Sequence, residues 1–402
     1  MQFLVEWKAG EESKAELCRR YGVSRRIGYK WAARYEAEGP SGLEERSRAA
    51  RHHPNQIPPA IVERILAIRY EHPLWGAPKL RAVFAEAYPD LACPAPSTIG
   101  EMLHRAGLTR APKPRRKTPP HTRPLAHADA PNDVVSIDFK GWFVCGDGAR
   151  VDPLTLVDNN SRYLLCCQIV AGCDYEHVRA VLDRVFRDYG LPRTIRSDNG
   201  APFATTALAG LSRLSIWWLK LGIEVERIEP AKPQQNGRQE RFHLTLKQHT
   251  ANPPEANASA QQRAFERFRR EYNEQRPHQA LGQRTPASVY APSPRRYPRP
   301  LATMEYRSDW AVRRVHKSGS IDWRGRELYL TRVLWGERVG LEPIADGVYR
   351  IWFGGLALGL LDERRGKIAP LPPPRGGGST AAAPADDAAD AAADTKTSFV
   401  KP

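Results

Sequence analysis

Three acidic residues, Asp138, Asp198 and Glu240, occupy positions from which a carboxylate could do chemistry. Asp138 interrupts the apolar run at residues 134–139, where a lone carboxylate is costly unless it meets water, a cation or a metal. Asp198 follows a strand-like segment and precedes Asn199-Gly200, a turn sequence that would expose the acid at a sheet edge. Glu240 lies near the start of an amphipathic helix, so a rigid element would carry it.

Carboxylates on separate elements can converge on two hard cations, and oxygen ligands suit Mg²⁺ or Mn²⁺. Two such ions about 4 Å apart can activate an attacking hydroxyl and stabilise the leaving oxygen of a phosphodiester. Taken singly, Asp198 could merely serve its turn and Glu240 could be a surface residue. Five other acids nearby stand in polar, turn-like contexts and are expected to be solvated: Asp133, Asp147, Asp152, Asp158 and Asp174.

The elements that must position these acids are expected between residues 132 and 290. Apolar segments at 134–139, 154–157 and 163–170 indicate three consecutive strands, and helices alternate with strands after them. This order predicts a mixed sheet with flanking helices.

Four motifs occur in sequence order across this region: Ser136-Ile-Asp138, Arg196-Ser-Asp-Asn-Gly200, Pro233-x-x-Asn-Gly-Arg-x-Glu-Arg-Phe-His243 and Tyr272-Asn-Glu-Gln-Arg-Pro-His-Gln-Ala-Leu281. Together they closely resemble the integrase-type DDE transposases of bacterial insertion sequences, relatives of retroviral integrases. The resemblance covers roughly residues 130–290, and the flanking regions look like the same family.

The resemblance implies a ribonuclease-H-like core at 132–290 in which Asp138, Asp198 and Glu240 form the catalytic triad with two Mg²⁺ or Mn²⁺ ions per site. The reaction would release a 3′-hydroxyl at the element end, which then attacks target DNA. Because 41 residues separate Asp198 from Glu240, somewhat more than usual in the family, a small insertion is expected within 204–228. The retroviral-type His/His/Cys/Cys zinc module is absent, and a helix-turn-helix occupies its place.

Residues 1–50 are predicted to be an all-α helix-turn-helix domain. Gly22 can supply a positive-φ turn, and Ser24 can cap a second helix. That helix carries the candidate DNA contacts Arg25, Arg26 and Lys30, with Ile27 and Trp31 as an apolar pair. A plain helical hairpin is the alternative.

Residues 58–108 predict a second helical domain, either helix-turn-helix-like or a spacer bundle. Residues 109–131 form a basic, proline-rich linker. Its cations Arg115, Arg116 and Lys117 are candidate DNA contacts, although the segment could equally be a solvated tether.

Further candidate DNA contacts lie around the helix of Glu240: Arg238, Arg241 and Lys247. The arginines could instead pair with surface acids, and the lysine could be solvated. His243 is expected to support or pack against the site, and Arg276 to be a buried hydrogen-bond donor.

Residues 308–365 contain short strand-like segments between glycine-rich turns, which predict a small β-barrel. Its cations and Trp323 suggest nonspecific DNA binding, with a plain basic surface as the alternative; the residues concerned are Arg313, Arg314, His316, Lys317, Trp323 and Arg324. Residues 366–402 are rich in Pro, Gly, Ala and Asp and predict a disordered tail.

The composition agrees with a polyanionic partner, because the chain carries a formal net charge of +16. Double-stranded DNA, as element ends and target, is the expected partner. A homo-oligomer, a dimer or tetramer, is expected because two ends must be joined together. No signal peptide and no apolar stretch near 18 residues occurs, so we expect a cytoplasmic, nucleoid-associated protein without membrane contact.

Two rival functions differ from a transposase. One is a catalytically silent helix-turn-helix regulator derived from a transposase, against which the complete acid triad argues. The other is a metal-dependent nuclease of the same fold that never joins strands. The two candidate DNA-reading domains and the barrel favour recombination, because joining requires the ends and the target to be held together.

Overall fold

The computed structural model describes residues 1–45, 56–109, 127–228, 237–298, 301 and 303–371. The chain divides into two compact units, Met1–Val62 and Glu63–Pro402. Among the described residues, no helix is both long and apolar enough to cross a membrane.

The N-terminal unit confirms the predicted helix-turn-helix region. Its helices are α1 (Gln2–Ala9), α2 (Lys14–Arg20), α3 (Arg25–Glu38) and the short η1 (Gly39–Leu43). Gly22 has φ +65°, and the Ser24 hydroxyl accepts a hydrogen bond from the Ile27 amide, so the predicted turn and cap are present. The expected apolar pair is wrong in part, because Ile27 is 44% exposed. The contact with α2 is made instead by Gly28, where a Cβ would lie only 2.8 Å from Cys18 Sγ.

A second group of helices follows: α4 (Pro59–Glu71), α5 (Ala77–Ala87) and α6 (Pro96–Arg105). They enclose a small apolar interior of Ile65, Trp75, Leu80, Phe84 and Ile99. The interior is built from the amphipathic spacing of each helix, since Leu80 and Phe84 are four residues apart and share one face.

The α/β core is built on a mixed five-stranded sheet in the order β5-β4-β1-β6-β7, which confirms the predicted fold class. Strands β4 and β5 are antiparallel additions to β1, whereas β6 and β7 run parallel to it. The strands are β1 (Val134–Phe139), β4 (Pro153–Asp158), β5 (Leu164–Ile169), β6 (Thr194–Ser197) and β7 (Glu224–Arg227).

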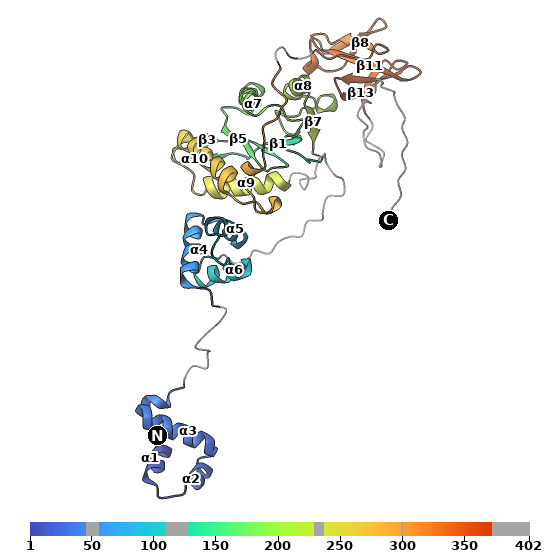
Figure 1. The fold of residues 1–402 in the computed structure, drawn as a ribbon. Coiled ribbons are helices and arrows are strands. Elements are labelled where there is room, and N and C mark those ends of the chain that lie inside the picture. The colour runs from blue at the N-terminus through green and yellow to red at the C-terminus, as the bar shows by residue number, and fades with distance from the viewer. Residues whose placement is uncertain (46–55, 110–126, 229–236, 299–300, 302, 372–402) are drawn as a thin grey trace, which may run out of the picture. The chain divides into compact units, whose positions relative to one another are not determined.

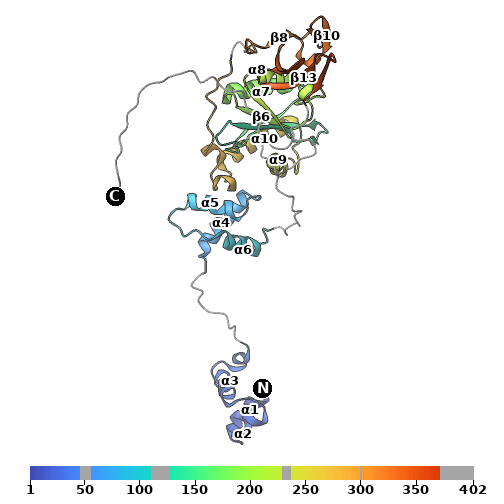
Figure 2. The ribbon, with the colours of Figure 1, turned by 90° about the vertical axis from the view of Figure 1, so that its right-hand side faces the viewer.

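Helices cover both faces of this sheet (Figures 1 and 2). One face carries α7 (Tyr175–Tyr189) and α8 (Arg213–Lys220), and the other carries α9 (Gly237–Thr250) and α10 (Ala258–Arg270). Successive side chains of a strand point to opposite faces, so Cys166 lies in the apolar cluster under α7 and α8, and Cys167 in the cluster under α9 and α10.

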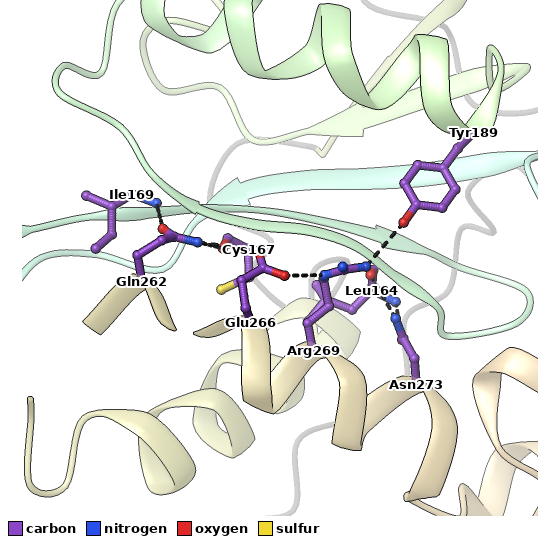
Figure 3. A network of polar contacts seen from close by, with 8 residues as sticks. All are labelled: Leu164, Cys167, Ile169, Tyr189, Gln262, Glu266, Arg269 and Asn273. Carbon is purple, nitrogen blue, oxygen red and sulfur yellow. Dashed lines mark hydrogen bonds and ion pairs between the residues drawn. The ribbon is translucent and has the colours of Figure 1, made fainter. Parts of the chain in front are cut away.

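The outer edge of β5 is covered by amide side chains from α10 and from the turn η4 (Glu271–Gln275) that continues it (Figure 3). Gln262 accepts from the Ile169 amide at 2.8 Å and donates to the Cys167 carbonyl at 3.1 Å. Asn273 accepts from the Leu164 amide at 2.8 Å and donates to the Leu164 carbonyl at 3.0 Å. Backbone groups that another strand would otherwise pair are thereby satisfied within the chain.

The C-terminal part is a small β-rich domain. Five strands form one sheet in the order β14-β13-β12-β11-β8, and β9 and β10 form a hairpin. The strands are β8 (Ala311–Arg314), β9 (Ser320–Trp323), β10 (Arg326–Tyr329), β11 (Arg338–Ala345), β12 (Val348–Phe353), β13 (Leu356–Asp362) and β14 (Lys367–Pro370). The tail predicted from residue 366 therefore begins too early, because Lys367–Pro370 pair with β13. Residues 372–402 lie outside the described residues.

The β-rich domain shares its apolar interior with the segment that follows β6. Leu211 and Ile216 are buried in the same cluster as Val339, Leu341 and Phe353. Lys220 at the end of α8 also forms an ion pair with Glu337 at 2.7 Å. The region in which we expected an insertion therefore supplies packing surface to the C-terminal domain.

Candidate functional site

Two of the predicted acids belong to the same end of the sheet. Strands β1 and β6 pair in parallel from Val134 opposite Thr194 to Ser136 opposite Arg196. Asp138 lies two residues beyond this pairing in β1, and Asp198 directly follows the last residue of β6. Neighbouring residues of parallel strands point to the same face, so both half-buried carboxylates belong to that end of the sheet.

A buried threonine links α9 to the strand of Asp138. Thr155 lies opposite Asp138 in β4, and its hydroxyl donates to the Asp138 carbonyl at 2.9 Å. The same hydroxyl accepts from Gln239 Nε2 at 3.0 Å and lies 2.9 Å from His243 Nε2. Because a hydroxyl has one hydrogen and two lone pairs, His243 must be the donor in the last contact. The first turns of α9 are thus fixed against β1.

Glu240 follows the buried Gln239 and is exposed on α9. Residues three and seven positions apart share a helix flank, so Glu240 lies on the flank of His243 and Lys247. Within the described residues, no three His, Cys, Asp or Glu side chains are grouped so that they could hold a metal ion. Residues 229–236, which lead into α9, lie outside the described part of the chain. The two aspartates therefore lie at the same end of adjacent strands, and Glu240 lies on a helix that packs on this sheet, but the described residues do not unite the three acids.

The same end of the sheet carries positive charge. Burial and the nearby Lys247 lower the pKa of Lys140, which follows β1 directly. Burial, and then Lys140, lowers the pKa of His243 to about 4, so this histidine is neutral near pH 7. A neutral ring agrees with its hydrogen bond to Thr155.

Two arginines near the site were missed in the sequence. Arg196 is buried, forms an ion pair with Glu226 at 2.5 Å, and lies two residues before Asp198 on the same strand face. Arg162 donates to the Asn159 carbonyl at 2.5 Å, and Arg238 lies 3.5 Å from that oxygen. Burial and the neighbouring Arg196 lower the pKa of Arg238. The sequence signal for Arg196 was its charge within a short strand, which predicts a buried cation with an acidic partner.

Asp158, which we expected to be solvated, is fully buried. Its carboxylate accepts from the Asn132 amide at 2.8 Å, the Ser161 amide at 2.7 Å and the Ser161 hydroxyl at 2.5 Å. Burial nevertheless raises its pKa. Asp158 therefore closes the β4–β5 turn. Asp152 is also half-buried, and burial raises its pKa.

The predicted DNA contacts fall on exposed surfaces wherever the structure describes them. Arg25, Arg26 and Lys30 are exposed on α3. Arg238, Arg241 and Lys247 are exposed on α9. Arg115, Arg116 and Lys117 lie outside the described residues.

In the β-rich domain, Trp323 is buried and packs against Tyr349, so it is not a surface aromatic. The exposed aromatics there are Tyr329 and Trp335, with Lys317 over the Trp335 ring at 5.8 Å. Arg276, expected to be a buried donor, contacts His249 Nε2 at 3.0 Å.

Models of known families match most of this architecture. Integrase core domain models match residues 128–233 and 221–286. A helix-turn-helix domain matches residues 1–51, and a homeodomain-like domain matches residues 27–103. The C-terminal domain of IS481 family transposases matches residues 310–369.

Individual relatives are also similar to the chain. The uncharacterized 31.7 kDa protein of insertion element IS407 from Burkholderia multivorans is 29% identical over 241 residues, covering 60% of this chain and 82% of that protein. The uncharacterized 39.2 kDa protein of insertion element IS476 from Xanthomonas euvesicatoria is 28% identical, covering 60% and 68%. Among solved structures, the HTLV-2 integrase catalytic core domain in complex with magnesium is 13% identical, with a TM-score of 0.31, covering 41% of this chain and all of that one.

Proposed function

Since the chain belongs to the integrase-type transposases of bacterial insertion sequences, we propose that it cleaves double-stranded DNA at element ends and joins the released 3′-hydroxyl to target DNA. Asp138, Asp198 and Glu240 are the proposed catalytic carboxylates. The observation that supports the proposal is the parallel β1–β6 pairing, which brings the chain positions of Asp138 and Asp198 to the same end of the sheet, next to a helix fixed through Thr155.

The donor chemistry of these residues fits a hard divalent cation. Two aspartates on adjacent strands offer only carboxylate oxygens, the ligands that Mg²⁺ and Mn²⁺ prefer. In the proposal Glu240 is the third ligand. Three carboxylates close together repel one another, so their convergence would require a bound cation. Two bound ions would supply activation of the attacking hydroxyl and stabilisation of the leaving oxygen.

The chain's own residues have supporting roles in this proposal. The contacts of Gln239 and His243 with Thr155 hold the helix that carries Glu240. Lys140 and Lys247 attract the phosphate backbone to the same end of the sheet. The α3 residues Arg25, Arg26 and Lys30 would recognise the element ends, and a dimer or tetramer would hold two ends together.

The decisive test is a strand-transfer assay with Mg²⁺ or Mn²⁺ on DNA taken from either side of the encoding gene. We expect Asp138→Asn, Asp198→Asn and Glu240→Gln to lose cleavage and joining while still binding DNA. Asp188→Asn, an exposed acid on α7, is the control and should remain active. If all three variants retained joining, or the unaltered chain bound DNA without metal-dependent chemistry, the proposal would be wrong.

Two further results would test the alternative function and the role of α3. Metal-dependent cleavage without joining would indicate a nuclease. Removal of residues 1–50 should cost end-specific binding more than nonspecific affinity. Footprinting that still showed the same protected ends would overturn the role of α3.

A further inference from the structure

A small two-stranded hairpin follows β1, the strand that carries Asp138, and forms a sheet of its own. Its strands are β2 (Phe143–Val144) and β3 (Arg150–Val151), with Val144 opposite Arg150. The inner face is packed, since Val151 is buried and Phe143 makes an edge contact with Phe265. The outer face is exposed: Trp142 is 57% exposed and Val144 is 44% exposed.

The tip of the hairpin is fastened to the body of the core. The Gly146 amide donates to the Glu255 carbonyl at 3.0 Å, and the Asp147 amide donates to the Ala256 carbonyl at 2.8 Å. A Cβ at Gly146 would lie 3.2 Å from Ala256 Cα, so the two segments pack closely. The exposed face is therefore held in place before any ligand arrives, which reduces the entropic cost of binding.

The outer face combines an indole with positive charge. The Arg150 guanidinium lies over the Trp142 ring, 4.4 Å from its centroid. A second cation is nearby, because Lys140 lies 4.8 Å from the ring centre of Phe143, the residue that packs against Phe265. Asp152, the acid close to both cations, is itself half-buried. An exposed aromatic ring with cations beside it matches a single-stranded nucleic acid, whose bases stack on the ring while its phosphates pair with the cations.

The distance to the reacting acids is limited by the chain. Three residues separate Trp142 from Asp138, so four Cα-to-Cα steps join them and their Cα atoms lie no more than about 14 Å apart. At about 3.4 Å for each nucleotide of one strand, this is about four nucleotides.

We propose that Trp142 and Arg150 form a stacking site for an unpaired DNA base within a few nucleotides of the reacting phosphodiester. The inference rests on the proposed function, because it takes DNA as the substrate of the carboxylate end. An unpaired base is required, since a base inside a duplex shows no free face. The site would hold the frayed element end in line with the carboxylates.

The test uses the full chain and a duplex of flanking DNA with a short single-stranded end that contains 2-aminopurine. We expect binding to quench the 2-aminopurine fluorescence, with the quench lost in Trp142→Ala and largely kept in Trp142→Phe. Affinity for the single-stranded end should fall about 5- to 100-fold in Trp142→Ala, and affinity for a blunt duplex should change little. Arg150→Ala should weaken binding and reduce its salt dependence. The matched control is Arg193→Ala. Arg193 is exposed and precedes the first residue of β6, whereas Asp198 follows the last.

The possible failures are separable. If the unaltered chain binds and joins DNA but Trp142→Ala keeps the quench and the affinity, only the stacking site is wrong. If the unaltered chain neither binds nor joins DNA, the proposed function fails first. A change in oligomeric state in Trp142→Ala, seen by sedimentation with the quench unchanged, would assign this face to contacts between copies and overturn the inference.

Discussion

Helices α9 and α10 pack on the same face of the sheet but use their polar side chains differently. Phe242 and Leu246 of α9 and Phe265 and Phe268 of α10 share one apolar cluster. Around it, α10 and its continuation bond to the backbone of β5 (Figure 3). Helix α9 is fixed to the sheet through Thr155, and its Glu240 and Lys247 side chains are exposed. The hydrogen-bond partners, and not the polarity of a helix, thus separate a structural face from a candidate functional one.

The largest expected difference between α9 and α10 comes from replacing one glutamate on each helix by glutamine. We expect Glu240→Gln to reduce strand transfer by about a hundredfold or more, because a carboxylate needed in the transition state is lost. Glu266→Gln should keep activity, because Glu266 serves an ion pair with Arg269 at 3.0 Å. Single-turnover rates measured at saturating DNA would show the difference. Equal losses in both variants would remove the distinction.

The next test concerns stability. Asn273→Ala leaves the amide and carbonyl of the buried Leu164 without their partner. Each unsatisfied buried group costs about 1–3 kcal/mol, so for the two groups we expect the free energy of unfolding to fall by about 2–6 kcal/mol. Gln262→Ala should cost less, because only one of the two backbone groups it leaves, the Cys167 carbonyl, belongs to a buried residue, whereas Ile169 is half-buried and water can reach its amide. Urea denaturation of the two variants measures the order, and a larger loss in Gln262→Ala would contradict it.

A smaller effect is expected from the C-terminal end of α9, which also has a structural contact. Burial, and then Arg276, lowers the pKa of His249 from 6.5 to about 4. The unfolded chain therefore binds a proton that the folded chain does not, and stability is lost as the pH falls from 6.5 towards 4. Protonation would also remove the Nε2 acceptor of Arg276.

We expect the urea midpoint to fall over this pH range and His249→Gln to flatten the fall, because glutamine can still accept from Arg276. His104→Gln, an exposed histidine on α6, is the control and should leave the fall unchanged. An unaltered slope in His249→Gln would show that this histidine is not the titrating group.

The smallest expected effect is on the salt dependence of DNA binding, and it compares an exposed cation on α9 with one on α10. Lys247→Ala should lower the slope of log affinity against log salt by about 0.9, the value for one lost phosphate contact. Arg267→Ala should leave the salt slope unchanged, because Arg267 on α10 already forms an ion pair with Glu255 at 2.8 Å. Fluorescence anisotropy with duplex DNA over a salt series measures both, and identical slopes would place neither residue on the DNA path.

The sequence was sufficient wherever the signal is local. The Gly22 turn and the Ser24 cap belong to neighbouring residues, so the helix-turn-helix region could be predicted and was confirmed. The mixed sheet followed from the order of apolar segments. The β1–β6 register could not be read from periodicity alone, because it depends on pairing between residues 60 positions apart.

Burial set by distant partners could not be predicted. Asp158 lies in a polar turn sequence, yet the amide of Asn132, 26 residues earlier, closes over its carboxylate. Trp323 and Trp142 are both aromatics beside basic residues, and only the packed structure distinguishes the buried ring from the exposed one. Strand β14 was assigned to the tail because its composition is that of a linker and its pairing with β13 is tertiary.

The interior shared by the β-rich domain and the segment after β6 limits how the C-terminal domain can move. Detaching that domain would expose Leu211 and Ile216 to water, at about 1.5–3 kcal/mol for each side chain. Rotation about a free tether is therefore disfavoured, and we expect the segment around Leu211 and Ile216 to move together with the C-terminal sheet. A nucleic acid bound by that sheet would therefore stay at a fixed distance from the end of the core sheet where we propose that DNA is cleaved.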